Sequence, residues 1–336
     1  MAYQVLLLDG PSGPGRVEEE ILAKVGAEIV RPRPDHEGEL ERLVADADAI
    51  LCDATPVTAS MLDRARKVQI ISEYGIGYDN IDVGAASQRG IWVSNVPGFC
   101  AEEVANHTMA LILAASRRLL ALDASTRAGG WDPIGVANGA VRLSTQRLGL
   151  VGFGHIGRRV AVRAVGFGLR VLAFSPNTTP ELAREYGAER VDLSTIFESS
   201  DYVSLHLPSN PETRNLINAA ALARFKSSAW LINTARGTVI DEAALLDALR
   251  GGRLAGAALD VRQAEPTPAP DEFRALPNVI LTPHAAFYSE QSLLELRERA
   301  AGNVAAVLAG GVPNHPVNPS IQPRFDPSEG IPAMWV

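Results

Sequence analysis

Residues 149–177 read GLVGFGHIGRRVAVRAVGFGLRVLAFSPN, and this stretch decides the fold. An apolar strand leads into Gly152-Phe153-Gly154-His155-Ile156-Gly157, which opens an amphipathic helix, and a second strand follows over 170–174. This is GxGxxG in its strand–turn–helix setting, where the first glycine allows the tight turn, the second admits a pyrophosphate and the third allows close helix packing. The pattern predicts a dinucleotide site, with N–H groups near His155 and Ile156 facing the phosphates.

The residue after the second strand bears on which dinucleotide binds. Such units usually place an acid there for the adenosine ribose, and this chain has Ser175. Serine neither accepts strongly from the ribose hydroxyls nor repels a 2′-phosphate, and 176–179 contain no Arg or Lys to select NADP. We expect relaxed selectivity with a slight preference for NAD, and NADP remains open.

Outside this stretch the chain alternates short apolar strands with amphipathic helices, which predicts parallel sheets covered by helices on both faces. Long helices are expected from Ala101 to about Leu122 and from about Ser289 to Leu308. The tail, 312–336, holds six prolines and is expected to lie as an extended surface arm. The expected strands are Tyr3–Asp9, Glu28–Val30, Ala49–Asp53, Val68–Ser72, Ile91–Asn95, Leu148–Val151, Arg170–Phe174, Tyr202–His206, Trp230–Thr234, Gly256–Val261 and Val279–Thr282.

Composition limits the function classes. A length of 336 residues suggests two domains, and a net charge of −8 gives no basic stripe for a nucleic-acid partner. Cys52 and Cys100 lie far apart without metal-ligand spacing, so neither a metal site nor a disulfide framework is expected. The chain begins without a signal-peptide pattern and has no run of ~18 apolar residues, so we expect a cytoplasmic protein with no membrane partner.

Three later segments each place a polar residue just after an expected parallel strand: LINTARG (231–237), ALDVRQAEP (258–266) and ILTPHAAF (280–287). Ligands bind at the carboxyl edge of such sheets, so Arg236, Glu265 and His284 are expected on the cofactor side. Arginine offers a planar fork for a carboxylate, and histidine can give or take a proton at a carbonyl or alcohol oxygen. A carboxylate beside the histidine raises its pKa and orients the ring.

Beside a nicotinamide, this trio predicts hydride transfer to a 2-oxo acid. Each residue alone also has a structural reading: a surface arginine, a loop acid before Pro266 and a capped core histidine. His206 ends another strand and is a candidate cofactor contact, although it has no acid partner in sequence and fits a structural role as well.

The chain resembles the D-isomer-specific 2-hydroxyacid dehydrogenase family over most of 70–310. Within that family, HAAFYSEQS is most similar to the C-terminal-binding-protein-like branch, which has Trp where Phe287 stands. The resemblance rests on EYGIGYDNID (73–82), SNVPGFCAEEVANHTMALILAASR (94–117), GLVGFGHIGRRVA (149–161), SLHLPSNPETRNLIN (204–218), INTARGTVIDEAALLDALRGGRLAGAALDV (232–261) and NVILTPHAAFYSEQSLLEL (278–296).

The resemblance implies a discontinuous, two-domain α/β layout. Residues 1–99 would begin a flavodoxin-like substrate domain, 100–287 would form a Rossmann-type NAD(P)-binding domain, and 288–336 would return to the substrate domain. The active site would lie in the cleft between them and close by hinge motion. Members are commonly homodimers joined through the cofactor domains, with the 101–122 helix in the interface.

The resemblance also assigns roles to residues. Arg236 would bind substrate, His284 would be the acid/base and Glu265 its partner. Backbone N–H groups of the Tyr74-Gly75-Ile76-Gly77 loop would hold the substrate carboxylate, and Phe287 would form an aromatic wall. Asp260 would lie near the nicotinamide carboxamide. Together with the residues already named from the sequence pattern, the expected cofactor contacts are Thr108, Gly152, Gly154, His155, Ile156, Gly157, Ser175, His206, Thr234, Ala235 and Asp260.

The leading interpretation is an NAD(P)-dependent D-2-hydroxyacid dehydrogenase acting reversibly at C2 of a small 2-oxo or 2-hydroxy acid. Glu265 argues against the formate dehydrogenase branch, which places Gln there. One alternative is a dinucleotide-sensing dimer of the corepressor type, and another is oxidation of phosphite or a one-carbon compound. Glyoxylate, hydroxypyruvate, phosphoglycerate and branched 2-oxo acids all remain candidate substrates.

Overall fold

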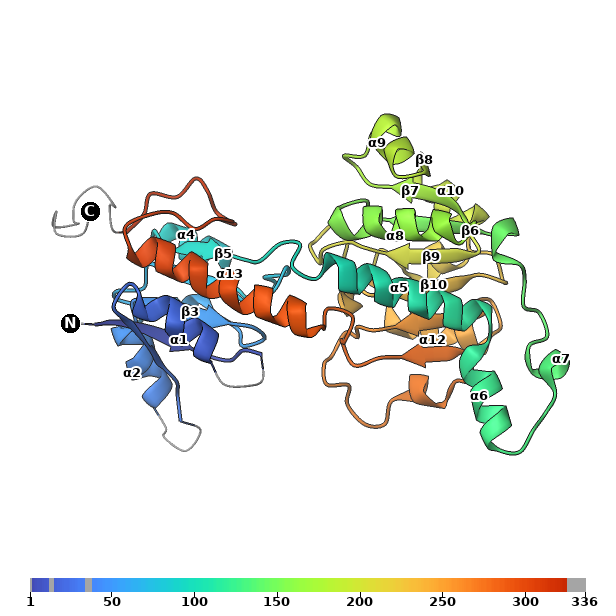
Figure 1. The fold of residues 1–336 in the computed structure, drawn as a ribbon, viewed down its shortest axis with the longest axis horizontal. Coiled ribbons are helices and arrows are strands. Elements are labelled where there is room, and N and C mark those ends of the chain that lie inside the picture. Colours follow the sequence, from blue (N-terminus) through green and yellow to red (C-terminus); the bar gives the residue numbers. More distant parts are fainter. Residues whose placement is uncertain (1, 12–14, 34–37, 325–336) are drawn as a thin grey trace. The chain divides into compact units, whose positions relative to one another are not determined.

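The structure is a computed structural model that describes residues 2–11, 15–33 and 38–324, which form two compact units (Figure 1). Unit 1 comprises Met1–Phe99 and Ser289–Val336, and unit 2 comprises Cys100–Tyr288. Each unit contains one parallel sheet, so the expected α/β class with two parallel sheets is confirmed. In the described residues, no helix is both long and apolar enough to cross a membrane.

Unit 1 contains a five-stranded sheet in the order β2-β1-β3-β4-β5. The middle strands β3 and β4 are wholly buried, as apolar strands covered on both faces should be. The long helix α13 packs beside α1 and over β4, and its Ala300 carbonyl accepts from the Ser72 hydroxyl at 3.0 Å. The elements are β1 (Tyr3–Leu7), α1 (Arg16–Ala23), β2 (Ala27–Val30), α2 (Glu39–Asp46), β3 (Ala49–Cys52), α3 (Ala59–Leu62), β4 (Ile70–Glu73), α4 (Val83–Gln88), β5 (Trp92–Ser94) and α13 (Glu290–Leu308).

The tail follows the outer edge of this sheet. Pro316 pairs antiparallel with Ser94, and the Val317 N–H donates to the Val93 carbonyl at 2.7 Å. The Asn318 side chain accepts from the Val93 N–H at 2.8 Å and donates to the Ile91 carbonyl at 3.0 Å. As far as residue 324, the expected extended arm is therefore fastened along β5; residues 325–336 lie outside the described residues.

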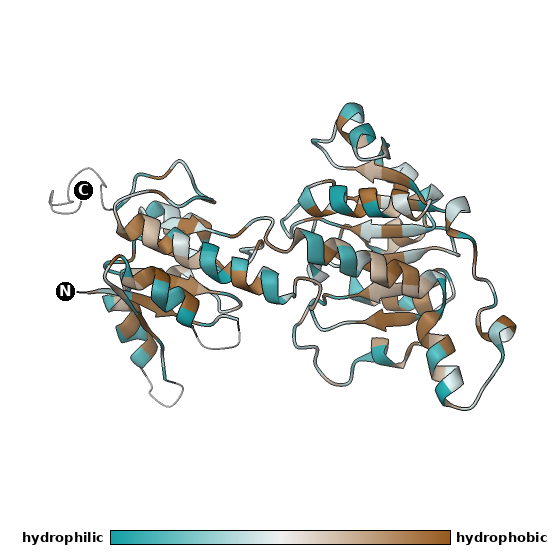
Figure 2. Cartoon of the chain, in the orientation of Figure 1, coloured by the Kyte–Doolittle hydropathy of each residue, from teal (hydrophilic) through white to brown (hydrophobic). Residues whose placement is uncertain are grey.

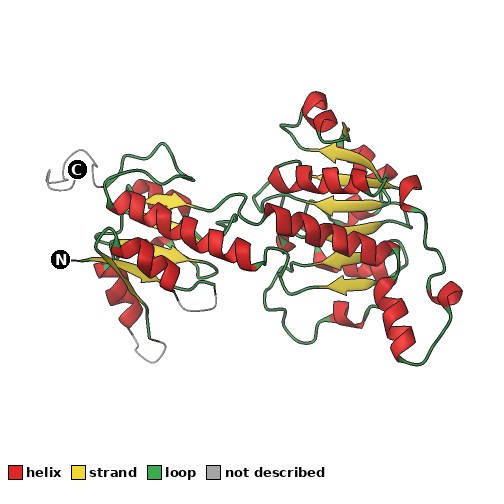
Figure 3. Ribbon diagram, viewed as in Figure 1, coloured by secondary structure: helices red, strands yellow, loops and turns green. Residues whose placement is uncertain are grey.

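Unit 2 contains a seven-stranded parallel sheet in the order β12-β11-β10-β9-β6-β7-β8 (Figure 3). The chain winds from β6 first to one side and then to the other, and sheets of this topology usually bind ligands at the carboxyl end of the strand where the order reverses, here β6. The elements are α5 (Ala101–Ser116), α6 (Leu119–Arg127), α7 (Pro133–Val136), β6 (Arg147–Val151), α8 (His155–Gly166), β7 (Arg170–Phe174), α9 (Pro180–Glu185), β8 (Ala188–Arg190), α10 (Leu193–Ser199), β9 (Tyr202–Leu205), α11 (Ala219–Leu222), β10 (Trp230–Asn233), α12 (Glu242–Arg250), β11 (Gly256–Leu259) and β12 (Val279–Leu281).

Two details of unit 2 differ from the expectation. The single helix expected from Ala101 to about Leu122 is two helices, because α5 ends at Ser116 and Arg118 takes a left-handed φ of 49° before α6. The strand β8 was not anticipated: it is a short edge strand with charged Glu189 and Arg190, so it lacks an apolar pattern. Both differences lie away from the strand ends that form the candidate site.

A buried acid ends β4. Glu73 is only 2% exposed and accepts from Asn80 Nδ2 at 3.1 Å and from Cys52 Sγ at 3.2 Å. Burial raises the pKa of Glu73 from 4.5 to about 8, and the charges of Asp53 and Asp9 act in the same direction. Glu73 is therefore protonated at neutral pH.

This acid makes stability depend on pH. Because the pKa of Glu73 in the folded protein exceeds its ordinary value, the free energy of unfolding should fall as pH rises from 4.5 to about 8. Glu73→Gln keeps a neutral side chain and removes this dependence. Relative to the wild type, the variant should gain a few kcal/mol between these pH limits, since one pKa unit corresponds to about 1.4 kcal/mol. Denaturant unfolding of both proteins across this range measures the difference; parallel curves would contradict the prediction.

Candidate active site

Three neighbouring strands of unit 2 deliver the predicted trio. Arg236 follows β10, Glu265 stands in the loop after β11, and His284 follows β12. Since β10, β11 and β12 are parallel neighbours, their carboxyl ends meet at one edge of the sheet. Glu265 and His284 are in direct contact, with 2.6 Å between Oε2 and Nδ1.

The electrostatics of this pair favour a charged histidine. The hydrogen bond with Glu265 raises the pKa of His284 above its usual value, burial opposes the rise, and the charge of Arg236 also lowers it. Burial would raise the pKa of Glu265, but the hydrogen bonds from His284 and from the Arg262 N–H together lower it. Both shifts favour the carboxylate–imidazolium form of the pair, and the charge of Arg236 acts on both groups.

Asp260 holds the turn that carries His284. The backbone of His284 is in the left-handed region, with φ of 52°, and its N–H donates to the Asp260 carbonyl at 2.7 Å. The buried Asp260 carboxylate accepts from the N–H groups of Ala285 at 2.9 Å and Ala286 at 3.0 Å. The Thr282 hydroxyl also donates to this carboxylate, at 2.5 Å. Asp260 therefore fixes the direction of the His284 side chain, and its predicted cofactor contact stays a prediction.

Two rings lie near this turn. The Phe287 ring stands edge-on to His284, with centroids 6.2 Å apart and planes at 83°. His107, on α5, contacts Thr282 Oγ1 at 3.1 Å through Nε2, which lies 3.6 Å from Asp260 Oδ1. His107 is not among the residues predicted from sequence, because a lone histidine on a helix gives no sign of a partner so distant along the chain.

The glycine turn has the shape expected for a dinucleotide. Gly152 has φ of 101°, and a Cβ there would come within 2.2 Å of the His206 carbonyl oxygen, so the turn lies directly against the end of β9. Gly154 precedes α8, and a Cβ there would meet nothing within 4 Å. The N-terminus of α8 therefore has free space before it, as a pyrophosphate requires.

Other predicted cofactor residues surround this turn. Thr108 and Thr234 are buried and hydrogen-bonded to each other at 2.9 Å, which ties α5 to the end of β10. Asn233, which sequence reasoning missed, accepts from the Ala235 N–H at 3.0 Å and donates to the Arg236 carbonyl at 2.9 Å. It shapes the turn that presents Arg236.

His206 sits behind the glycine turn. Burial lowers its pKa to about 4, so the ring is neutral. Its Nε2 lies 3.0 Å from Ser204 Oγ, and its Nδ1 is buried without a hydrogen-bond partner in the described part of the chain. Ser175 is half-buried at the end of β7. Contact of either residue with a cofactor remains a prediction.

In unit 1, fewer residues of the expected substrate loop offer a free backbone N–H than the sequence suggested. The Tyr74 N–H donates to the Cys52 carbonyl at 2.7 Å and its hydroxyl to Glu18 Oε1 at 3.0 Å, so Tyr74 has no free N–H for a substrate. The Gly75 carbonyl accepts from the Val96 N–H at 2.8 Å, and the Ile76 carbonyl from Asn95 Nδ2 at 2.7 Å. Within the described residues, the N–H groups of 75–77 have no partner, which leaves a row of free donors.

Comparison with known proteins identifies the family to which the chain belongs. The model of the D-isomer specific 2-hydroxyacid dehydrogenase NAD-binding domain matches residues 109–286. A glyoxylate reductase of Korarchaeum cryptofilum is 41% identical over 283 residues, covering 83% of this chain and 85% of that protein. The chain belongs to the D-isomer-specific 2-hydroxyacid dehydrogenase family.

Solved structures of two other enzymes have a similar fold. A D-lactate dehydrogenase from Aquifex aeolicus, complexed with NAD and lactic acid, has a TM-score of 0.84 at 28% identity, covering 93% of this chain and 98% of that one. An acyclic imino acid reductase, Bsp5, in complex with NADPH and D-Arg has a TM-score of 0.83 at 28% identity, covering 94% and 99%. The chain is thus an NAD(P)-dependent 2-hydroxyacid dehydrogenase, an oxidoreductase acting on CH–OH groups, and unit 2 contains its NAD(P)-binding domain.

The expected branch within the family requires correction. Further relatives at 39% identity, from Thermococcus litoralis, Thermofilum pendens and Aeropyrum pernix, are also glyoxylate reductases and not C-terminal-binding proteins. The HAAFYSEQS motif was a weak guide to the branch, because it is far shorter than the 283 residues over which the glyoxylate reductase aligns.

Substitutions of two of the three glycines in the glycine turn, Gly152 and Gly154, should separate effects on stability from effects on cofactor binding. Gly152→Ala forces a side chain onto the His206 carbonyl at a positive φ, so it should destabilise the protein by about 1–3 kcal/mol or more. Gly154→Ala meets no protein atom, so it should fold normally but weaken NADH binding by about tenfold or more, since its Cβ enters the phosphate space.

Thermal unfolding and NADH titration of both variants measure these effects. Gly154→Ala is the matched control for the stability loss, and the wild type is the control for binding. Wild-type NADH affinity in Gly154→Ala would show that the pyrophosphate does not approach this turn.

Proposed function

We propose that this dehydrogenase reduces glyoxylate, or a 2-oxo acid of similar size, with His284 as the proton donor. The observation that carries the proposal is the Glu265–His284 contact of 2.6 Å at the carboxyl edge of the cofactor-binding sheet. The choice of glyoxylate is supported by the curated relatives at 39–41% identity, which are glyoxylate reductases.

In this proposal, the chain's own residues bind the substrate and move one proton. A bound nicotinamide cofactor supplies the reducing equivalent at the substrate C2. His284 donates its proton to the carbonyl oxygen, and its raised pKa keeps it charged until then. Glu265 accepts a hydrogen bond from Nδ1–H of His284 and so keeps that proton on the ring. The proton given to the substrate therefore comes from Nε2.

The substrate carboxylate needs donors of its own. We propose that the Arg236 guanidinium binds it through two parallel N–H···O bonds. In unit 1, the free N–H groups of 75–77 are suited to an anion such as a carboxylate, because successive backbone N–H groups form anion-binding concavities. Orientation by several donors fixes C2 relative to His284.

We also propose that both dinucleotides serve, with a slight preference for NAD. The N–H groups at the start of α8 would hold the pyrophosphate. Ser175 carries neither a charge that repels a 2′-phosphate nor one that attracts it. The related structures hold NAD in one case and NADPH in the other, which supports this reading.

A homodimer through the cofactor unit is a further part of the proposal. Apolar side chains are exposed on and after α6: Leu119 is 57% exposed, Trp131 89% and Ile134 84%. Figure 2 shows hydrophobic stretches along the ribbon of α6 and α7. Exposed apolar residues grouped in this way mark association sites. The corepressor-type alternative would share the dimer but lack turnover.

Steady-state kinetics test the activity. The wild type should oxidise NADH and NADPH with glyoxylate, with kcat/KM values for the two cofactors differing by much less than about a hundredfold. A bias of that size would overturn the relaxed selectivity, and no turnover across a panel of 2-oxo acids would favour the binding-protein alternative.

His284→Ala provides the control for the mechanism. Loss of the proton donor should lower kcat by about 10²–10⁴-fold. NADH affinity should stay within a few-fold of the wild type, because His284 donates no group to the pyrophosphate turn. Turnover near the wild-type rate would exclude His284 as the donor.

Oligomeric state tests the dimer. The wild type should sediment as a dimer, and Trp131→Ser with Ile134→Ser should shift it toward monomer, because both side chains would be buried in the interface. Val162→Ser, at a residue 53% exposed on α8, is the control for a generally less apolar surface. A wild-type monomer would refute the proposal.

A further inference from the structure

We propose that Arg262 is a positioning residue for the catalytic pair: its guanidinium, bound by Glu242 and Asp271, fixes the loop that holds Glu265 against His284. The inference rests on the proposed role of His284 as the proton donor. Arg262 itself touches neither His284 nor any reacting atom in this assignment, so it acts through the loop backbone.

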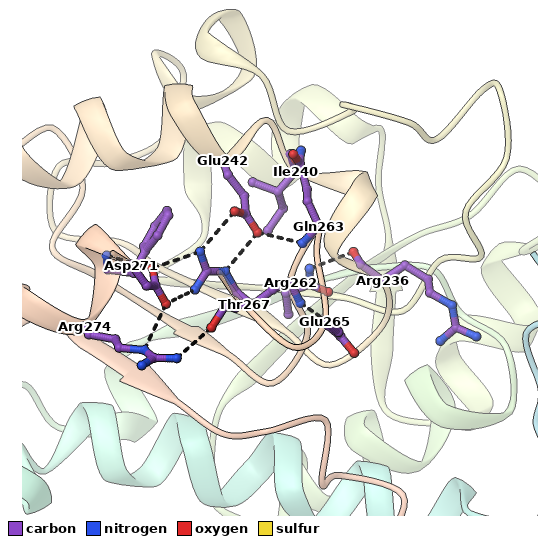
Figure 4. A network of polar contacts seen from close by, with 11 residues as sticks. Arg236, Ile240, Glu242, Arg262, Gln263, Glu265, Thr267, Asp271 and Arg274 are labelled. Atoms are coloured by element: carbon purple, nitrogen blue, oxygen red, sulfur yellow. Dashed lines mark hydrogen bonds and ion pairs between the residues drawn. The ribbon is translucent and has the colours of Figure 1, made fainter. Parts of the chain in front are cut away.

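The guanidinium is held on two sides (Figure 4). Its Nε lies 2.9 Å from Glu242 Oε1 and its Nη2 3.0 Å from Glu242 Oε2. Its Nη1 lies 2.9 Å from Asp271 Oδ2, and its Nη2 3.3 Å from Asp271 Oδ1. The planar fork of arginine matches two carboxylates at once, which the single ammonium of lysine does not.

Burial makes this network more than a surface ion pair. The Arg262 side chain is 11% exposed and the Asp271 side chain 4%. The guanidinium carbon lies 4.3 Å from the centre of the Phe273 ring. Removing Arg262 would leave two facing carboxylates without their shared cation, a much larger penalty than the loss of an exposed pair.

The Glu242 carboxylate also holds the backbone next to Arg262. The Gln263 N–H donates to Glu242 Oε1 at 2.8 Å, and the Gln263 side chain donates to the Ile240 carbonyl at 2.6 Å. A Cβ on Gly237 would come within 1.9 Å of the Arg262 carbonyl carbon, so the residue after Arg236 lies directly on the Arg262–Gln263 peptide. The loop is thus anchored to the segment that follows Arg236, from Gly237 to Glu242.

This anchoring reaches Glu265 through one hydrogen bond. The Arg262 N–H donates to Glu265 Oε1 at 2.7 Å, while Glu265 Oε2 meets His284 Nδ1 at 2.6 Å. Each carboxylate oxygen therefore has one partner, and the Arg262 backbone supplies one of the two. If the loop shifts, Glu265 loses this support and its contact with His284 weakens.

The expected consequence is a change in the protonation of His284. Within unit 2, the groups acting on His284 are Glu265, Arg236 and Asp260, and His107 lies beside Asp260. Of these, Glu265 makes the dominant contribution that keeps the pKa of His284 raised. Weakening that contact should lower the pKa, whereas a purely structural role for Arg262 would leave it unchanged.

Arg262→Gln tests the inference against a matched control. Arg224→Gln removes another arginine of unit 2, whose ion pair with Glu198 is exposed. The pKa of His284 is read in the ligand-free protein by NMR titration of the imidazole signals, with the His284 signal assigned from its absence in His284→Ala. The pH profile of kcat/KM for glyoxylate reduction is recorded in parallel.

In Arg262→Gln, the pKa of His284 and the alkaline limb of the kcat/KM profile should both fall by about one unit. Arg262→Lys should give a smaller shift, because it keeps the charge but loses the fork, and Arg224→Gln should give none. If Arg262→Gln does not fold, the same measurement is made on Arg262→Lys and Asp271→Asn. Folded variants with an unmoved His284 pKa would overturn the inference.

The two hypotheses fail differently. A lowered His284 pKa without any change in the pH profile would support the positioning role and contradict the proposed role of His284 as proton donor. An unchanged pKa with a normal profile would contradict the positioning role alone.

Discussion

The hydrogen bond between Glu265 and His284 is the interaction on which the site depends, and it exists because β10, β11 and β12 are parallel neighbours. Parallel pairing brings the residues after each strand to one edge of the sheet. Arg236 and His284 come soon after their strands, so strand geometry nearly fixes them. Glu265 comes later, in a loop that must turn back toward His284. It needs the additional anchoring that the Arg262 N–H supplies, while Asp260 holds the turn of His284 on the other side of the contact.

Close backbone approach is the second constraint. At Gly152 the dinucleotide turn lies on the His206 carbonyl, and at Gly237 the segment beside Arg236 lies on the Arg262–Gln263 peptide. In both places the glycine lies so close to the neighbouring backbone that a residue with a Cβ would not fit. Each contact packs one loop directly against the end of a neighbouring strand: the glycine turn against the end of β9, and the segment after Arg236 against the loop that follows β11.

The features predictable from sequence were those with short-range patterns. GxGxxG between a strand and a helix predicted the turn, and polar residues after apolar strands predicted Arg236, Glu265 and His284. The roles of Asn233, His107 and Arg262 depend on partners far along the chain, such as Thr282 for His107, and no spacing rule reveals them. The expected helix is interrupted at Arg118, whose left-handed φ cannot be predicted from its residue type. The strand β8 was missed because it lacks an apolar pattern.

At Tyr74 and Glu73, burial changes what the side chains and backbone groups of a sequence motif can do. Sequence reasoning treated Tyr74 as part of the substrate loop, yet its N–H belongs to the sheet and its hydroxyl to Glu18. Glu73 precedes that loop, and an ionised carboxylate there would repel the carboxylate that the N–H groups of 75–77 are proposed to bind. Because burial raises the pKa of Glu73 to about 8, the acid is neutral at physiological pH. The hydrophobic core of unit 1 thus removes a negative charge from behind the proposed anion site, and this loop can act as a donor row although an acid precedes it in sequence.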